Sequence, residues 1–159
     1  MITQYPNNIL SKKSRAVNPV TRADAATLQA MADIMKKTDG LGLAAPQIGI
    51  NRRMIVARTP EGTVKMINPV IKRRAGESIM YEGCLSIPGV TVAVKRSRMI
   101  TVSGLNEHGE HIMMEAVGLI SHVFQHEIDH LNGRLIIDYL PAQEKMKLHA
   151  YVMEKRRRQ

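Results

Sequence analysis

The stretch Val117–Leu131, VGLISHVFQHEIDHL, predicts the helix around which the rest of the fold is arranged. Its apolar residues recur at helical spacing, and Asn132-Gly133 after it is a typical helix end. His126 and His130 are four residues apart, so both imidazoles lie on one face and can bind one metal ion. Glu127 lies next to that face, where it can act as a general base on a water activated by the metal. This pattern predicts a catalytic metal site, whereas the plainer interpretation is a pair of surface histidines.

A third ligand is needed, because a catalytic site of this kind uses three protein ligands and one open position. Cys84 is the only cysteine of the chain, and the Gly and Pro residues that flank it predict an extended, fixed backbone. Lone cysteines are more often small buried hydrophobes, but beside the helix motif Cys84 is the favoured ligand. A second candidate is His122, which extends the histidine stripe but would spread the ligands over two helical turns. A single cysteine also fits a reducing compartment.

The chain around this helix predicts an α+β fold, in which short, mostly antiparallel strands pack around a central metal-binding helix. An N-terminal helix is predicted between Pro19 and Gly40, and a C-terminal helix from Ala142 towards Arg156. The small-sided Gly40–Gln47, GLGLAAPQ, predicts a loop or irregular strand. Strands are predicted at Met54–Ala57, Val64–Ile67, Val90–Val94, Met99–Val102 and His111–Met114, with a hairpin turn at Asn106–Gly109. We expect residues 1–140 to form a single catalytic metallohydrolase domain, with residues 141–159 as a basic helix belonging to it.

Composition limits the possible functions. The chain has 159 residues, 44% of them hydrophobic, which is ordinary for one globular domain. Its 23 basic and 14 acidic residues give a net charge of +9, which favours anionic partners such as nucleic acid. Aromatic residues are only 3%, with no Trp, so a protein that binds single strands by stacking is not expected. No apolar run is long enough to span a membrane, and the first residues do not form a signal peptide.

Three segments are specific when taken together: Gly40–Gln47 (GLGLAAPQ), Glu82–Ser86 (EGCLS) and Gln125–His130 (QHEIDH). Together they resemble the three motifs of the peptide deformylase family, in its compact form with a C-terminal helix. They are intact and in order, and weaker similarity extends over nearly the whole chain. The zinc proteases that share the two-histidine helix have no cysteine ligand of this kind.

The resemblance implies an enzyme that removes the N-formyl group from the initiator methionine of nascent polypeptides. It implies one divalent metal ion held by Cys84, His126 and His130, natively Fe²⁺, with Zn²⁺, Ni²⁺ or Co²⁺ able to substitute. Glu127 would first take a proton from the attacking water and then return it to the departing amine. The backbone N–H of Leu85 and the side-chain amide of Gln47 would stabilise the oxyanion.

Substrate contacts and supporting residues follow from the same alignment. Gly42 has no Cβ to block an extended formylpeptide from approaching the strand edge. A pocket for the methionine side chain is expected from Leu41, Met80, Leu119, His122 and Val123, with the ring of His126 at its base. His122 stands where the family often has an apolar residue or Arg, and Met80-Tyr81 is bulkier than expected. Glu82 and Arg96 match a family ion pair, and Asp129 is expected to hydrogen-bond behind the ligands.

Two other functions remain possible from the residues alone. A zinc endopeptidase would use the helix motif but leave Gln47 and Cys84 unexplained. A basic ribosome- or RNA-associated module would hold a structural metal, closed by four protein ligands. For the leading hypothesis we expect a monomer in the bacterial cytoplasm, with no membrane association.

The C-terminal segment Lys145–Gln159 has six basic residues and one acidic residue. Met146, His149, Val152 and Met153 form part of an apolar stripe, which predicts a helix laid on the body. The segment is therefore a candidate contact to ribosomal RNA, the alternative being a solvated end.

Overall fold

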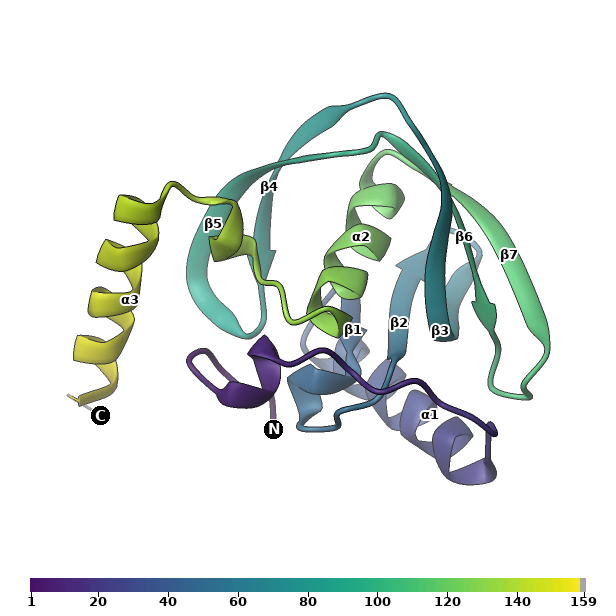
Figure 1. Ribbon diagram of the computed structural model, residues 1–159. Helices are drawn as coiled ribbons and strands as arrows, with labels where there is room; N and C mark the ends of the chain where they lie inside the picture. The colour runs from purple at the N-terminus through teal and green to yellow at the C-terminus, as the bar shows by residue number, and fades with distance from the viewer. Residues whose placement is uncertain (158–159) are drawn as a thin grey trace.

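The protein folds into a five-stranded sheet, a two-stranded sheet and three α-helices, as described for residues 1–157 by a computed structural model (Figure 1). The larger sheet is antiparallel in the order β1-β2-β3-β6-β7, and β4 and β5 form an antiparallel hairpin. The strands are β1 Gly42–Ala44, β2 Met54–Thr59, β3 Gly62–Ala75, β4 Ser78–Cys84, β5 Ile87–Arg96, β6 Met99–Leu105 and β7 His111–Val117. The helices are α1 Arg22–Lys37, α2 Leu119–Leu131 and α3 Ala142–Arg157. Three short 3₁₀ helices cover Asn8–Ser11, Ala45–Ile48 and Ile136–Tyr139.

Strand β2 contributes side chains to two hydrophobic cores, one on each face of the larger sheet. Successive side chains of a strand point to opposite faces, and both faces of β2 are buried. Ile55 and Ala57 belong to the core that contains Phe124 and Leu131 of α2. The alternate residues Met54 and Val56 pack instead with residues of α1. The sheet therefore carries α2 on one face and α1 on the other.

Helix α2 lies between the two sheets, with β3, β6 and β7 on one side and the β4–β5 hairpin on the other (Figure 1). A third core beneath the hairpin joins Leu10, Val94 and Ile136. Strand β3 reaches from one sheet towards the other, and its pairing with β6 shifts register between Ile67 and Val70. A shift of this kind bends a strand and increases its twist, which fits Pro69, a residue that cannot donate to the ladder.

The predicted fold class is confirmed, including the central helix and the terminal helices. The boundaries of several elements were wrong. Strand β4 was not predicted, and β3 and β5 extend well beyond Val64–Ile67 and Val90–Val94. Gly40–Gln47 contains the short β1 followed by a 3₁₀ turn, and α2 begins at Leu119 rather than Val117. The strand predictions followed short apolar runs, whereas pairing across the sheets extends the strands beyond those runs.

Helix α3 lies at the edge of the molecule (Figure 1). The face that we predicted for its contact was partly wrong, because Met146 is 72% exposed while Leu148 packs against the third core. The hydroxyl of Tyr5 lies 2.6 Å from Nδ1 of His149 and links the helix to the N-terminal segment. The last two residues of the predicted basic segment, Arg158 and Gln159, lie outside the described residues.

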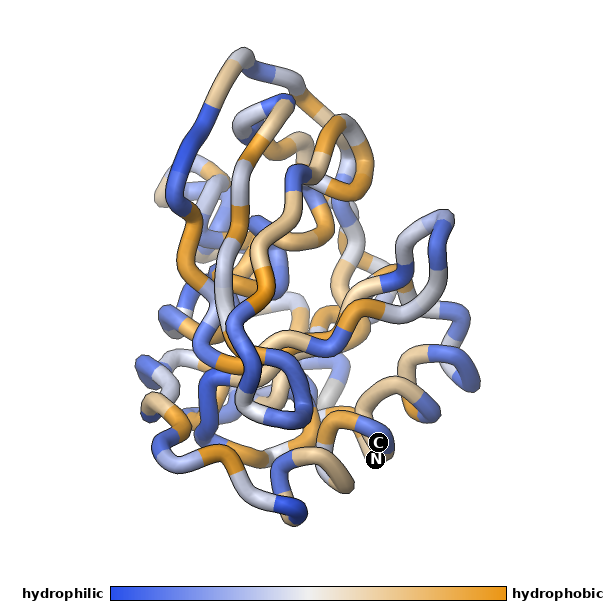
Figure 2. The backbone as a smooth tube through the Cα atoms, turned by 90° about the vertical axis from the view of Figure 1, so that its right-hand side faces the viewer, coloured by the Kyte–Doolittle hydropathy of each residue, from blue (hydrophilic) through white to orange (hydrophobic). Residues whose placement is uncertain are grey.

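Hydrophobic and hydrophilic residues are intermixed along the backbone (Figure 2). In β6, buried and half-buried residues alternate along the whole strand, as expected where the two faces have different surroundings. Within residues 1–157, none of the helices has the length and apolar character needed to cross a bilayer.

Candidate active site

The three sequence motifs meet at one cavity of about 280 Å³. The loop before β1, the end of β4 and the first turns of α2 form its walls. Its lining includes every residue predicted to contact substrate: Leu41, Gly42, Met80, Leu119, His122 and Val123. Gln47, Cys84, Leu85, His126 and Glu127 line the same space. The structure thus brings together residues that are up to 87 positions apart, from Gly40 to Glu127.

The three predicted ligands converge as their spacing requires. One ligand atom from each of Cys84, His126 and His130 lies within 4.8 Å of the other two. Sγ of Cys84 lies 3.3 Å from Nε2 of His130, and the rings of His126 and His130 pack edge to face. Nδ1 of His130 is buried and has no hydrogen-bond partner among residues 1–157. Two imidazoles and one thiol form a donor set that suits zinc and similar divalent ions.

The pKa values of His130 and His126 shift in opposite directions. Burial lowers the pKa of His130 well below its ordinary value, so this ring is neutral, which is the form that binds metal. Burial also disfavours charge on His126, but hydrogen bonds to Cys84 and Glu82 and the nearby Glu127 outweigh it and raise the pKa of His126 to about 10. A metal ion at this position would have to displace that proton.

Glu127 is held in an environment suited to a base. The residue is 4% exposed, and its Oε2 is buried without a hydrogen-bond partner among residues 1–157. Burial raises the pKa of Glu127 to about 7, although the charge of His126 opposes the shift. A Cβ at Gly42 would lie only 2.5 Å from Oε1 of Glu127. Gly42 thus leaves space for the base as well as lining the cavity.

The side chain of Gln47 is oriented by the backbone beside it. Its Oε1 accepts a 2.8 Å hydrogen bond from the N–H of Ala44, so its amide nitrogen must point the other way. That nitrogen lies 3.7 Å from Sγ of Cys84 and 3.3 Å from Oγ of Ser86. An amide donor is therefore fixed beside the thiol, on a residue that is only 1% exposed.

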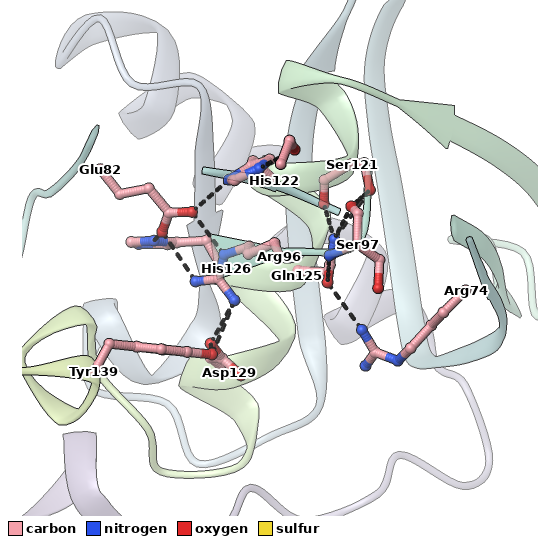
Figure 3. A network of polar contacts seen from close by, with 11 residues as sticks. Arg74, Glu82, Arg96, Ser97, Ser121, His122, Gln125, His126, Asp129 and Tyr139 are labelled. Atoms are coloured by element: carbon pink, nitrogen blue, oxygen red, sulfur yellow. Dashed lines mark hydrogen bonds and ion pairs between the residues drawn. The ribbon is translucent and has the colours of Figure 1, made fainter. Parts of the chain in front are cut away.

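The predicted supporting residues form one buried network (Figure 3). Arg96 donates two hydrogen bonds to Glu82, at 2.6 and 2.9 Å, and a third to Asp129 at 2.8 Å. Arg96 and Glu82 are 6% and 9% exposed, which rules out the interpretation as solvated surface charges. Although burial opposes ionisation, hydrogen bonds from His126 and Arg96 lower the pKa of Glu82 to about 2. Glu82 is consequently a carboxylate at neutral pH.

Three residues of this region were missed from the sequence. Tyr139 donates to Asp129 at 2.6 Å and accepts from Arg96 at 3.1 Å. Ser86 contacts Gln47, and its place in the second motif was the signal that could have identified it. Ser78 lies 2.8 Å from Nε2 of His122. Neither Ser78 nor Tyr139 has a sequence signal, because both contacts depend on tertiary structure.

His122 does not join the ligand group. Its Nδ1 lies 2.8 Å from Oε1 of Glu82 (Figure 3). Its Nε2 lies 2.8 Å from Oγ of Ser78, so both ring nitrogens have a partner. The three-histidine alternative is not the group that the structure brings together. A fourth protein ligand, which a structural metal site would have, is likewise not part of the group found within residues 1–157.

A family model described as polypeptide deformylase matches residues 1–146. The chain belongs to this family. Peptide deformylase of Carboxydothermus hydrogenoformans is 44% identical over 137 residues, covering 86% of this chain and 90% of that protein. Among solved structures, peptide deformylase from Ehrlichia chaffeensis has a TM-score of 0.93 at 32% identity and covers 98% of this chain and 96% of its own. That from Thermotoga maritima has a TM-score of 0.84 at 40% identity, with 87% and 95% covered.

Peptide deformylases are metal-dependent hydrolases that remove the N-formyl group from nascent polypeptides, and this is the activity of the chain. The similarity spans almost the full length of the relatives, and several of them are bacterial. Neither a zinc endopeptidase nor a non-enzymatic RNA-associated module is supported by these relatives.

Proposed function

We propose that the divalent metal of this deformylase is held by Cys84, His126 and His130. The observation that carries the proposal is the convergence of their ligand atoms within 4.8 Å, with Cys84 and His126 lining the cavity. The fit is supported by the neutral state of His130 and by the buried Oε2 of Glu127, which has no partner within residues 1–157. The set leaves an open fourth position, as catalytic sites require.

In this proposal Glu127 is the general base and then the general acid. A bound divalent ion would supply a polarised water of lowered pKa. Glu127 takes the proton of the attacking water and returns it to the departing nitrogen, because an amine leaves poorly without one. A pKa of about 7, raised by burial, suits both transfers.

The oxyanion that forms at the formyl carbon is assigned to two donors. The amide nitrogen of Gln47 is directed towards Cys84 because Oε1 is held by Ala44. The second donor is the backbone N–H of Leu85, which lines the same cavity. Preorganised donors of this kind typically contribute about 10²–10³ in rate.

The methionine side chain of the substrate is assigned to the apolar part of the cavity. Its walls are Leu41, Gly42, Met80, Leu119, His122 and Val123. Burying a methionine side chain gives about 1.5–3 kcal/mol, or roughly 10- to 150-fold. Formyl-Met peptides should therefore exceed formyl-Gly peptides in kcat/KM by that factor, and acetyl-Met peptides should barely react. Equal rates on formyl-Met and formyl-Gly would remove the pocket assignment.

Glu82, Arg96 and Asp129 are assigned to support the ligands. Glu82 lies 3.0 Å from Nδ1 of His126 and accepts both hydrogen bonds of Arg96 described above. Asp129 holds the other end of Arg96 together with Tyr139. A carboxylate behind a ligating histidine orients its ring and fixes its tautomer.

We propose Fe²⁺ as the native ion, with Zn²⁺, Ni²⁺ or Co²⁺ able to replace it. The test is an assay on a formyl-Met tripeptide under anaerobic conditions, with metal content measured on the same sample. Activity should follow iron content, and removal of the ion by a chelator should abolish it. Full activity in metal-free protein would contradict the proposal, and zinc-loaded protein as active as iron-loaded protein would contradict the choice of iron.

The finer partner and location are also proposals. Residues 1–140 would form a single catalytic domain, and residues 141–159 a basic helix of the same domain that contacts ribosomal RNA near emerging chains. The enzyme would act as a monomer in the bacterial cytoplasm. Changing Lys155, Arg156, Arg157 and Arg158 together to Ser should weaken ribosome binding and reduce its log–log salt dependence by a few units. Unchanged ribosome binding would leave the segment as solvated charge.

A further inference from the structure

His122 lines the cavity, but the proposed deformylation steps give its two ring nitrogens no task. It lies on the first turns of α2 at the wall of the cavity and is only 2% exposed. Nδ1 is 2.8 Å from Oε1 of Glu82, and Nε2 is 2.8 Å from Oγ of Ser78. A buried histidine with both nitrogens occupied indicates a fixed ring, since an unpaired polar atom there would cost free energy.

The shared neighbour of His122 is the carboxylate that also contacts a metal ligand. Oε1 of Glu82 accepts a hydrogen bond from Nε of Arg96 and contacts Nδ1 of His122. Oε2 accepts a hydrogen bond from Nη2 of Arg96 and contacts Nδ1 of His126 (Figure 3). Each carboxylate oxygen thus has one guanidinium donor and one imidazole donor. His122 and His126 therefore contact the same carboxylate, each at a different oxygen.

The hydrogen bonds assign the protons. A carboxylate only accepts hydrogen bonds, so Nδ1 of both His122 and His126 must carry a proton. With Nδ1 bound to Glu82, Nε2 is the nitrogen of His126 left for the metal site, and it becomes a ligand once a metal ion displaces its proton. On His122, Nε2 is in hydrogen-bond contact with the hydroxyl of Ser78 at 2.8 Å. One line of contacts therefore runs from the first residue of β4 through His122 and Glu82 to a proposed ligand.

We propose that His122, held by Ser78, is a positioning residue that fixes the Glu82 carboxylate and through it the orientation of His126. The inference rests on the proposed ligand set and extends it by one further layer. Loss of a partner behind a ligand typically costs about 10- to 100-fold in metal affinity. Because His122 acts one contact further away, we expect its loss to fall near the lower end.

The decisive variants differ in whether a donor to Glu82 remains. His122→Leu keeps an apolar side chain of useful size but has no donor, whereas the amide of His122→Asn can replace Nδ1. Zinc affinity is measured on metal-free protein by competition with a chromophoric chelator. The visible spectrum of Co²⁺-loaded protein reports ligand geometry, which loss of packing alone would not move. His111→Leu, the same change at an exposed histidine of β7, is the matched control.

We expect His122→Leu to bind zinc about tenfold more weakly and to shift the cobalt spectrum, following the cost of losing a supporting partner. His122→Asn should remain within about twofold of wild type with an unshifted spectrum, as should His111→Leu, because neither loses the donor to Glu82. Wild-type affinity and spectrum in His122→Leu would overturn the proposal. Equal loss in His122→Leu and His122→Asn would also overturn it, because the donor would then be irrelevant.

Two further variants keep the test decisive. If His122→Leu does not fold, Ser78→Ala replaces it, since it removes only a hydroxyl. A small loss of zinc affinity in Ser78→Ala is expected, and no loss would contradict the proposal. Cys84→Ala, measured alongside, tests the ligand set separately from the role of His122. Retained zinc affinity in Cys84→Ala would mean that the proposed ligand set is wrong.

Discussion

Helices α2 and α3 have comparable lengths, 13 and 16 residues, but the fold holds them very differently. Nine side chains of α2 are buried, from Ser121 to Leu131, and the helix lies between the two sheets. No described side chain of α3 is fully buried, and Leu148 and the contact between Tyr5 and His149 hold it to the body. The proposed catalytic residues His126, Glu127 and His130 therefore lie on the helix whose position is fixed by contacts with both sheets. A peripheral helix is free to serve contacts that tolerate variation.

The largest effect is expected from Glu127→Gln on α2. The amide has nearly the same size but can neither take nor return a proton. General acid–base help is typically about 10²–10⁴-fold, and this residue is used twice. The tripeptide rate should fall by at least that factor while metal content stays at the wild-type level. A variant that retains more than a tenth of wild-type activity at saturating metal would contradict the assigned role.

Gly42→Ala should be nearly as damaging although it adds one methyl group. The new Cβ would lie 2.5 Å from Oε1 of Glu127, so the carboxylate has to move. A displacement of about 1 Å at a catalytic group can cost about 10²-fold. Gly89→Ala, where no atom lies within 4 Å of the added Cβ but φ is +78°, controls for the backbone cost alone. Turnover and thermal unfolding should be measured on both variants. Only Gly42→Ala should lose much more turnover than its loss of stability accounts for.

The comparison also predicts how activity depends on pH. Glu127 must be ionised to act as a base, and burial raises its pKa to about 7. Bound metal favours the carboxylate and lowers this pKa, and below the lowered value kcat/KM should fall about tenfold per pH unit.

Unfolding should not cause this acid limb. Glu82 has a folded pKa of about 2 against an ordinary 4.5, so its contribution to stability is present above pH 4.5 and is lost as the pH falls through about 2. The folded fraction, followed by circular dichroism, should stay constant over the pH range in which kcat/KM falls. A rate profile that stays flat down to the pH of unfolding would contradict the assignment of Glu127.

The smallest effect is expected on α3. Changing Lys155, Arg156, Arg157 and Arg158 together to Ser should leave the tripeptide kcat/KM within about twofold, because no transition-state contact is lost. A tenfold loss would mean that α3 supports the active site, and the contrast between the two helices would not hold.

What could be predicted from the sequence follows from the range of each interaction. His126, Glu127 and His130 were identifiable because helical periodicity is local. Around Cys84 the sequence predicted an extended backbone but not a paired strand, because the pairing of β4 with β5, which shifts register at Cys84, is formed only in the fold. The contact of Gly42 with Glu127 and that of Ser78 with His122 join distant positions in the chain. No periodic pattern encodes such contacts, so they required the folded structure.

The most direct test of the central claim is X-ray absorption at the metal edge of the loaded enzyme. The account predicts a first shell of one sulfur and two imidazole nitrogens from the protein, at about 2.3 Å and about 2.0–2.1 Å for zinc. It also predicts an oxygen at the open position and loss of the sulfur signal in Cys84→Ala. A first shell without sulfur, or one closed by four protein ligands, would contradict the account.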